Sequence, residues 1–210
     1  MSEIERIVCG SGNAFIVSEG ENAVLVDTCR KAGRDTILER CLTKNIGLIV
    51  LTHGHIDHVD NAAYLSKSFD APIAMHRNDI ALTINSWAEP LSARSLLGKM
   101  IIQTSIKSFK QDSIEPFEPQ AFLDDGDTLE GYGIPATIIG LPGHTKGSIG
   151  LIVNGTDVLV GDALMNILYP TKTPLYGDRK TMVESAAKIS SLGNVTIHFG
   201  HGNPIKNRIW

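Results

Sequence analysis

A cluster of histidines directly after an apolar run constrains this chain more than any other feature. Residues 48–51 read Leu-Ile-Val-Leu, which predicts a buried strand, and residues 52–58 read Thr-His-Gly-His-Ile-Asp-His. In an extended segment, side chains two residues apart project to the same side, so His53, His55 and Asp57 can converge where the strand leaves its sheet. We therefore expect a fold in which one edge of a sheet collects these side chains.

Imidazole nitrogens and carboxylate oxygens are ligands that zinc and other borderline divalent ions accept. His58 adds a fourth such group if the chain turns into a helix after Asp57. Four ligands within one short segment suit two ions better than one. The alternative is that these histidines are solvated or hydrogen-bonded surface residues, which is the usual fate of a lone histidine.

Three later positions share one local pattern, in which an apolar run ends beside glycine and is followed at once by a metal-ligand residue type. The three residues are His144, Asp162 and His201. Glycine allows the backbone to turn sharply or to approach an ion closely. Each position alone is equally well explained by a turn glycine with a capping aspartate or a surface histidine. Together with residues 53–58 they predict a site of seven residues.

The charges of these seven residues suit a hydrolytic centre. Five neutral histidines and two aspartates set a charge of −2 against +4 from two divalent ions. The remaining positive charge would hold a bridging hydroxide, because a bound divalent ion lowers the pKa of water from about 15.7 toward roughly 7.

These residues resemble the metallo-β-lactamase fold superfamily, whose signature is a His-x-His-x-Asp-His run followed by spaced His, Asp and His. The resemblance extends from the segment Leu25-Val26-Asp27-Thr28 to Gly200-His201-Gly202. It implies an α/β fold, an αββα sandwich of two mixed β-sheets flanked by helices. It also implies that the metals lie at one edge of the two sheets.

The resemblance implies a role for each residue of the predicted site. The first ion would be held by His53, His55 and His144, the second by Asp57, His58 and His201, and Asp162 would bridge both. Asp57 would also be catalytic, because it could orient the bridging hydroxide. The two divalent ions are expected to be zinc, with iron or manganese as alternatives.

The sequence is most similar to the glyoxalase II-like group, which implies a metal-dependent hydrolase of a small ester, thioester or lactone. True β-lactamases usually carry cysteine at the position of Asp162, so antibiotic hydrolysis is not expected. Only nine residues follow His201, which leaves no room for a C-terminal glutathione-binding domain and argues against glutathione thioesters. Two alternatives are a mononuclear iron persulfide dioxygenase of the same superfamily and a non-catalytic metal-dependent binding module.

The remaining sequence predicts one domain over residues 1–210. Residues 4–27 read as three short strands and residues 37–42 as part of a helix. A helix over residues 59–69, a strand over 72–75 and a helical insertion near 79–120 follow, the last supported by the spacing of Ile102, Ile106 and Phe109. Further strands are expected near residues 121–123, 128–130, 136–141, 148–153, 158–160 and 195–199, with a helix that begins at a capping box on Thr181.

Charge and hydropathy restrict the partners. The chain has 19 basic and 23 acidic residues and no cluster of Lys or Arg, which argues against nucleic acid. No apolar run is long enough to cross a membrane, and the acidic N-terminus is unlike a signal peptide. We therefore expect a cytoplasmic protein that acts on a small molecule, with a homodimer left open. Cys9, Cys29 and Cys41 lack the spacing of a disulfide or zinc framework.

Several residues outside the seven have two interpretations. Asp27 could accept a hydrogen bond from a ligand histidine or cap a turn, and His76 and His198 are expected to be structural. The side chains of residues 79–120 suit either a lid over the metals or a packing helix pair; they include Trp87, Arg94, Lys99, Phe109 and Phe117. Tyr169 and Tyr176 could face the substrate.

Overall fold

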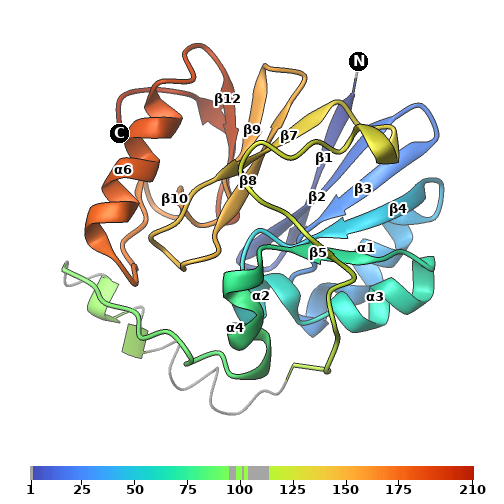
Figure 1. Ribbon diagram of the computed structural model, residues 1–210, viewed down its shortest axis with the longest axis horizontal. Helices are drawn as coiled ribbons and strands as arrows, with labels where there is room; N and C mark the ends of the chain where they lie inside the picture. The colour runs from blue at the N-terminus through green and yellow to red at the C-terminus, as the bar shows by residue number, and fades with distance from the viewer. Residues whose placement is uncertain (1, 95–97, 101, 104–113) are drawn as a thin grey trace.

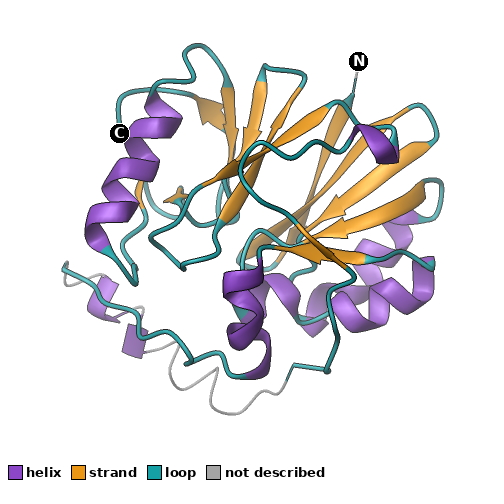
Figure 2. Cartoon of the chain, viewed as in Figure 1, coloured by secondary structure: helices purple, strands orange, loops and turns teal. Residues whose placement is uncertain are grey.

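Two β-sheets pack face to face and carry helices on their outer faces (Figures 1 and 2). The structure is a computed structural model, and it describes residues 2–94, 98–100, 102–103 and 114–210. The first sheet contains, in spatial order, β1 (Glu3–Cys9), β2 (Gly12–Glu19), β3 (Asn22–Val26), β4 (Asn45–Val50), β5 (Ile73–Met75) and β6 (Ala121–Phe122). Strands β1 to β3 are antiparallel and β3 to β6 are parallel.

The second sheet is also mixed. Its spatial order is β13 (Ile205–Lys206), β12 (Thr196–His198), β9 (Asp157–Leu159), β8 (Ile149–Val153) and β7 (Ala136–Gly140). Only the β9–β12 pair is parallel. A separate two-stranded ribbon joins β10 (Leu164–Met165) to β11 (Thr171–Lys172). The expected sandwich of two mixed sheets is therefore confirmed.

Alternation along the strands builds the layers. On β2, Phe15 and Val17 belong to the core between the two sheets, whereas Ile16 belongs to the core on the outer face of the first sheet. Side chains of successive strand residues point to opposite faces, so an uninterrupted apolar run supplies both cores. On β7, Ile138 faces the other sheet and Ile139 faces the helix side of the second sheet.

The helices close the outer faces. Helices α1 (Arg34–Cys41) and α3 (Ala62–Phe69) cover the first sheet, and α6 (Arg179–Ser190) covers the second. Two short helices, α2 (Ile56–Val59) and α4 (Ile80–Ile84), lie near the edge where the strands end (Figure 1). The 3-10 turns are η1 (Lys31–Gly33), η2 (Arg77–Asp79) and η3 (Glu130–Tyr132).

Three expectations about the helices are corrected. The helix expected over residues 59–69 is split after Val59, because the Asn61 side chain donates hydrogen bonds to the carbonyls of Thr28 and Arg30 instead of facing solvent. The N-cap of the last helix lies three residues before the expected one, Thr181. Asp178 is its N-cap, and its carboxylate accepts a hydrogen bond from the Thr181 backbone N–H at 3.0 Å.

The third correction concerns the segment near 79–120, which is helical only in part. Helix α4 ends at Ile84, and residues 85–94 are irregular except for a bridge between Ser92 and Tyr176. Ile106 and Phe109 lie outside the described residues. The strand expected near residues 128–130 is only a single bridge from Thr128, followed by η3.

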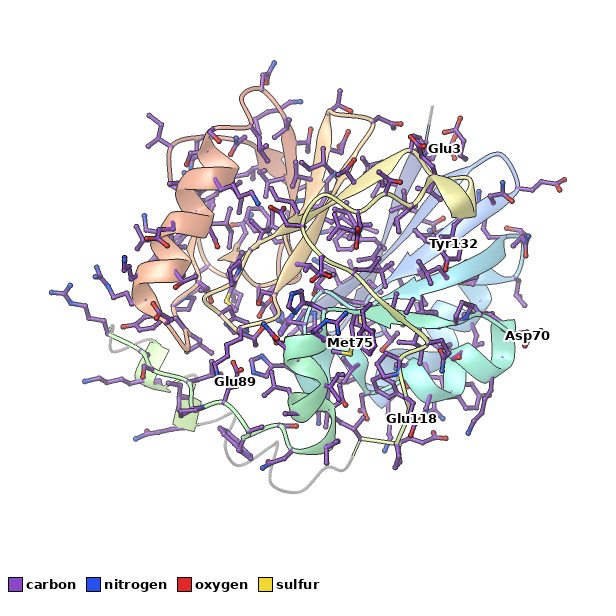
Figure 3. All side chains as sticks on the ribbon, in the orientation of Figure 1. Glu3, Asp70, Met75, Glu89, Glu118 and Tyr132 are labelled. Atoms are coloured by element: carbon purple, nitrogen blue, oxygen red, sulfur yellow. The ribbon has the colours of Figure 1, made fainter. Side chains whose placement is uncertain are left out.

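Figure 3 shows where the labelled side chains lie relative to these layers. Met75, at the end of β5, is fully buried, whereas Asp70 and Glu118 lie at the surface. The cysteines at positions 9, 29 and 41 are free thiols. Among the described residues, no helix combines the length and the apolar character that crossing a bilayer requires.

Candidate metal centre

The seven predicted site residues lie on four segments that each follow the carboxyl end of a strand, and Asp57 and His58 belong to helix α2 in the first of them. Strand β4 leads to residues 53–58, β7 to His144, β9 to Asp162 and β12 to His201. Strands β7, β9 and β12 run in the same direction, so their loops meet at one edge of the second sheet. The rigid sheets therefore fix where these side chains point.

The structure brings all seven residues together in overlapping groups whose possible ligand atoms lie within 4.8 Å of one another. The groups are His53 with His55 and His144, His53 with His58 and Asp162, and Asp57 with His58 and His201. Six of the seven side chains are buried, and only the Asp57 side chain is a quarter exposed. The first and third groups match the two sets that the sequence predicted.

Contacts outside the site orient two of the rings. The Nδ1 atom of His144 donates to the carbonyl oxygen of Leu175 at 2.8 Å, and the Nδ1 atom of His201 donates to that of Ser11 at 2.8 Å. A carbonyl can only accept, so each neutral ring carries its proton on Nδ1 and directs the Nε2 lone pair into the site. Nε2 of His144 lies 3.0 Å from Nδ1 of His55.

Asp27 orients a third ring. This buried carboxylate accepts from Nδ1 of His58 at 2.8 Å and from the backbone N–H and the hydroxyl of Thr52 at 2.8 and 2.9 Å. The Thr52 hydroxyl in turn lies 3.1 Å from Nδ1 of His53. Of the two roles that the sequence left open for Asp27, the structure shows the acceptor for a site histidine.

Asp162 lies between the two predicted sets. Its Oδ1 atom is 3.4 Å from Nε2 of His58, and its Oδ2 atom is 3.6 Å from Nε2 of His144 and 3.5 Å from Nε2 of His201. Gly200 allows this approach, because a Cβ atom there would lie 2.6 Å from the Asp162 carboxylate. The carboxylate can therefore reach both sets at once.

The carboxylates divide the histidines into two electrostatic classes. Burial opposes a positive charge on His58, but Asp27 and Asp162 outweigh it and raise the His58 pKa to about 10. Burial also opposes the charge on His201, and Asp162 and Asp57 raise its pKa well above 6.5. For His53 and His55, burial and the neighbouring rings lower the pKa, to about 3 in the case of His55.

This division predicts a proton release that differs between the two sets. An ion bound at His58 and His201 would have to displace protons, whereas one bound at His53 and His55, which are neutral at pH 7, would not. We expect binding to the set with His58 to release about two protons and to tighten as pH rises from 6 to 9. Calorimetric titration in buffers of different ionisation enthalpy measures this release. Equal proton release in both binding steps would contradict the prediction.

A cavity of about 560 Å³ opens beside the seven residues. His55, Asp57, His144, Asp162 and His201 contribute to its wall, and most of the remaining wall is apolar. The other lining side chains include Trp87, Leu91, Arg94, Ile102, Ile167, Leu168, Tyr169, Lys172 and Tyr176. Trp87, Leu91, Arg94 and Ile102 therefore border the cavity, as do Tyr169 and Tyr176, the two tyrosines that could face a substrate. An apolar wall around a few convergent polar groups is typical of small-molecule sites.

The two remaining histidines have structural partners. His198 Nε2 lies 2.9 Å from Asp157 Oδ1, and His76 Nε2 lies 3.2 Å from Asp124 Oδ1. Neither belongs to the metal-binding groups of the described residues. Both contacts agree with the structural role expected for these two rings. One residue that the sequence gave no reason to select is Asp79, a buried carboxylate that contacts two of the site loops.

The fold and the clustered histidines and carboxylates define a class of metal-binding α/β protein, and comparison with known proteins identifies the family. A family profile described as the metallo-beta-lactamase superfamily matches residues 7–201, so the chain belongs to that superfamily. The uncharacterized protein Rv2581c of Mycobacterium tuberculosis is 30% identical over 204 residues, which cover 91% of this chain and 86% of that protein.

A second relative carries a functional name. Hydroxyacylglutathione hydrolase GloC of Haemophilus influenzae is 29% identical over 208 residues, which cover 96% of this chain and 90% of that protein. Among solved structures, the crystal structure of TTHA1623 in a di-iron-bound form superposes with a TM-score of 0.71. Its sequence identity is 24%, over 97% of this chain and 94% of that chain, so this likeness supports the fold alone.

Proposed function

We propose that this protein is a dinuclear metal-dependent hydrolase that cleaves a small ester, thioester or lactone. In this proposal His53, His55 and His144 hold one divalent ion, Asp57, His58 and His201 hold the other, and Asp162 bridges them. Zinc is the expected metal, with iron or manganese as alternatives. A small molecule is the expected substrate, and one domain spanning residues 1–210 carries the activity.

One observation carries the metal assignment. The Nε2 atoms of His53 and His58 and the Oδ1 atom of Asp162 are buried and have no hydrogen-bond partner, and all three belong to one metal-binding group. An unpartnered buried polar atom costs about 1–3 kcal/mol, so three such atoms at one point favour a bound ion there. The donor set of nitrogens and carboxylate oxygens suits zinc or iron.

The chain's own residues supply the rest of the chemistry. When bound, divalent ions generate a nucleophile from water and polarise a carbonyl oxygen. The Asp57 carboxylate faces the cavity and keeps a depressed pKa, because hydrogen bonding from His201 and the charges of His58 and His201 outweigh its burial. It therefore stays ionised and can orient a water molecule. The apolar wall holds an uncharged carbonyl substrate and excludes bulk water.

The GloC relative supports thioesters as the first substrates to test. The chain covers 90% of that protein, which bears the name hydroxyacylglutathione hydrolase. Chain length therefore does not argue against glutathione thioesters, because this chain spans most of a protein with that name. A glutathione thioester belongs in the substrate panel beside simple acyl thioesters, esters and lactones.

The test is a panel assay on zinc-loaded protein with these substrates and a phosphodiester. We expect hydrolysis of at least one carbonyl substrate at a rate proportional to metal occupancy. The variant Asp157→Asn serves as the control, because it alters a carboxylate that pairs with the structural His198. It should hydrolyse the same substrates at the rate of the unaltered protein. Silence of the fully loaded protein across the panel would contradict the proposal and favour a metal-dependent binding module.

A further inference from the structure

Among the described residues outside the seven-residue site, Asp79 is the most enclosed carboxylate. It ends η2, has 0% of its surface exposed, and pairs with no Lys or Arg side chain among the described residues. An ionised carboxylate is expensive to bury without a cation, so its partners must be unusually well placed. Those partners all belong to the loops that carry His53, His55 and His144.

Three donors converge on Asp79 from two loops. The Gly54 backbone N–H donates to Oδ2 at 2.9 Å, and Gly54 stands between His53 and His55. From the second loop, the Thr145 hydroxyl donates to Oδ2 at 2.7 Å and the Gly147 backbone N–H donates to Oδ1 at 2.6 Å. Thr145 directly follows His144 in the chain. One carboxylate therefore joins the two loops that carry the first predicted metal set.

The two glycines are required for this contact. A Cβ atom at Gly54 would lie 2.7 Å from the Asp79 backbone oxygen, and one at Gly147 would lie 2.5 Å from Asp79 Oδ1. Neither glycine has a positive φ. A side chain is therefore excluded at both positions by close packing against Asp79 rather than by a turn conformation.

We infer that Asp79 is a positioning residue that sets the separation of His53 and His55 from His144 and thereby tunes the affinity of this metal set. The inference rests on the proposed metal centre. Asp27 plays the corresponding part for the other set, because it binds His58 directly. Asp79 instead acts through the backbone of Gly54 and the side chain of Thr145. Asp79 is not among the described residues that line the cavity beside the site.

The isosteric variant Asp79→Asn tests this inference. Asparagine has only one acceptor oxygen, so in either orientation its amide N–H₂ group faces the backbone N–H of Gly54 or of Gly147. Two donors cannot bond to each other, so at least one of these hydrogen bonds is lost. We expect the affinity of the His53–His55–His144 set for Zn²⁺ to fall about 10–100-fold, the usual effect of losing support for a metal ligand. The affinity of the set with Asp57, His58 and His201 should stay within about twofold.

The readout is a stepwise Zn²⁺ titration against a chromophoric chelator, which yields two dissociation constants. Imidazole resonances of His144 and His201 assign each step to its set. Thermal unfolding of the metal-free protein is measured in parallel. The control Asp125→Asn alters a carboxylate that also accepts a backbone N–H, from Gly140, but lies outside the metal centre. Both of its constants should match those of the unaltered protein.

A second variant covers the case in which Asp79→Asn folds poorly. Thr145→Val removes one donor without changing the size of the side chain, and it should weaken the same set selectively by a smaller factor. Unchanged constants in both variants, or an equal fall in both sets, would overturn the inference. If the fully loaded unaltered protein hydrolyses nothing, the proposed function fails while this contrast in affinity remains measurable.

Discussion

Replacing Asp162 with alanine is expected to reduce turnover by about a thousandfold or more. Its carboxylate lies within 3.6 Å of Nε2 atoms from His58, His144 and His201, so its loss removes a carboxylate that reaches both predicted metal sets. Charge stabilisation at such a centre contributes several kcal/mol to the barrier, and 1.36 kcal/mol corresponds to about tenfold in rate. Steady-state kinetics on the best panel substrate measures the loss.

Asp157→Ala is the matched control for this prediction. Asp157 also pairs with a histidine, His198, at 2.9 Å, but this pair lies outside the metal centre. The control should keep turnover within about twofold. Wild-type turnover in Asp162→Ala would contradict the assignment of this carboxylate, whereas equal losses in both variants would indicate a general loss of folded protein.

Removing bound metal is expected to abolish hydrolysis and to lower the melting temperature by about 8–16 °C for each ion lost. An ion present at about a thousand times its dissociation constant stabilises the fold by about 4 kcal/mol, and 1 kcal/mol shifts the melting temperature of a chain of this size by about 2–4 °C. Circular dichroism before and after dialysis against a chelator follows both the fold and its melting.

The metal-free protein should nevertheless remain folded. Its three apolar clusters do not include the site, and protonated His58 and His201 offset the charges of Asp57 and Asp162. Added Zn²⁺ should restore both activity and melting temperature. Full activity in protein with less than about a tenth of an equivalent of metal would contradict the prediction.

The local parts of the site could be predicted from the sequence because they depend on short-range geometry. The spacing of His53, His55 and Asp57 follows from the two-residue period of an extended chain, and His144, Asp162 and His201 each follow a strand end. The sandwich could be predicted from the resemblance that these residues carry and is confirmed by the order of the two sheets.

The contacts that orient the site could not be predicted in this way. The carbonyl of Ser11 meets His201 across 190 residues of chain, and Asp79 meets Gly147 across 68. Such contacts depend on tertiary packing and leave no local pattern.

The start of the last helix could not be predicted for a different reason. Both Asp178 and Thr181 are good capping residues, and only the structure shows that Asp178 is the N-cap.

Elemental analysis of the isolated protein after loading with divalent metal tests the dinuclear centre most directly. The arrangement of the seven side chains predicts two ions bound per chain of 22.7 kDa. In the variant Asp162→Ala, only one of the two sets of ligands should still bind an exchangeable ion. One iron per chain together with oxygen uptake on a glutathione persulfide would favour the dioxygenase alternative instead. Less than one equivalent of any metal after loading would contradict a metal centre at this site.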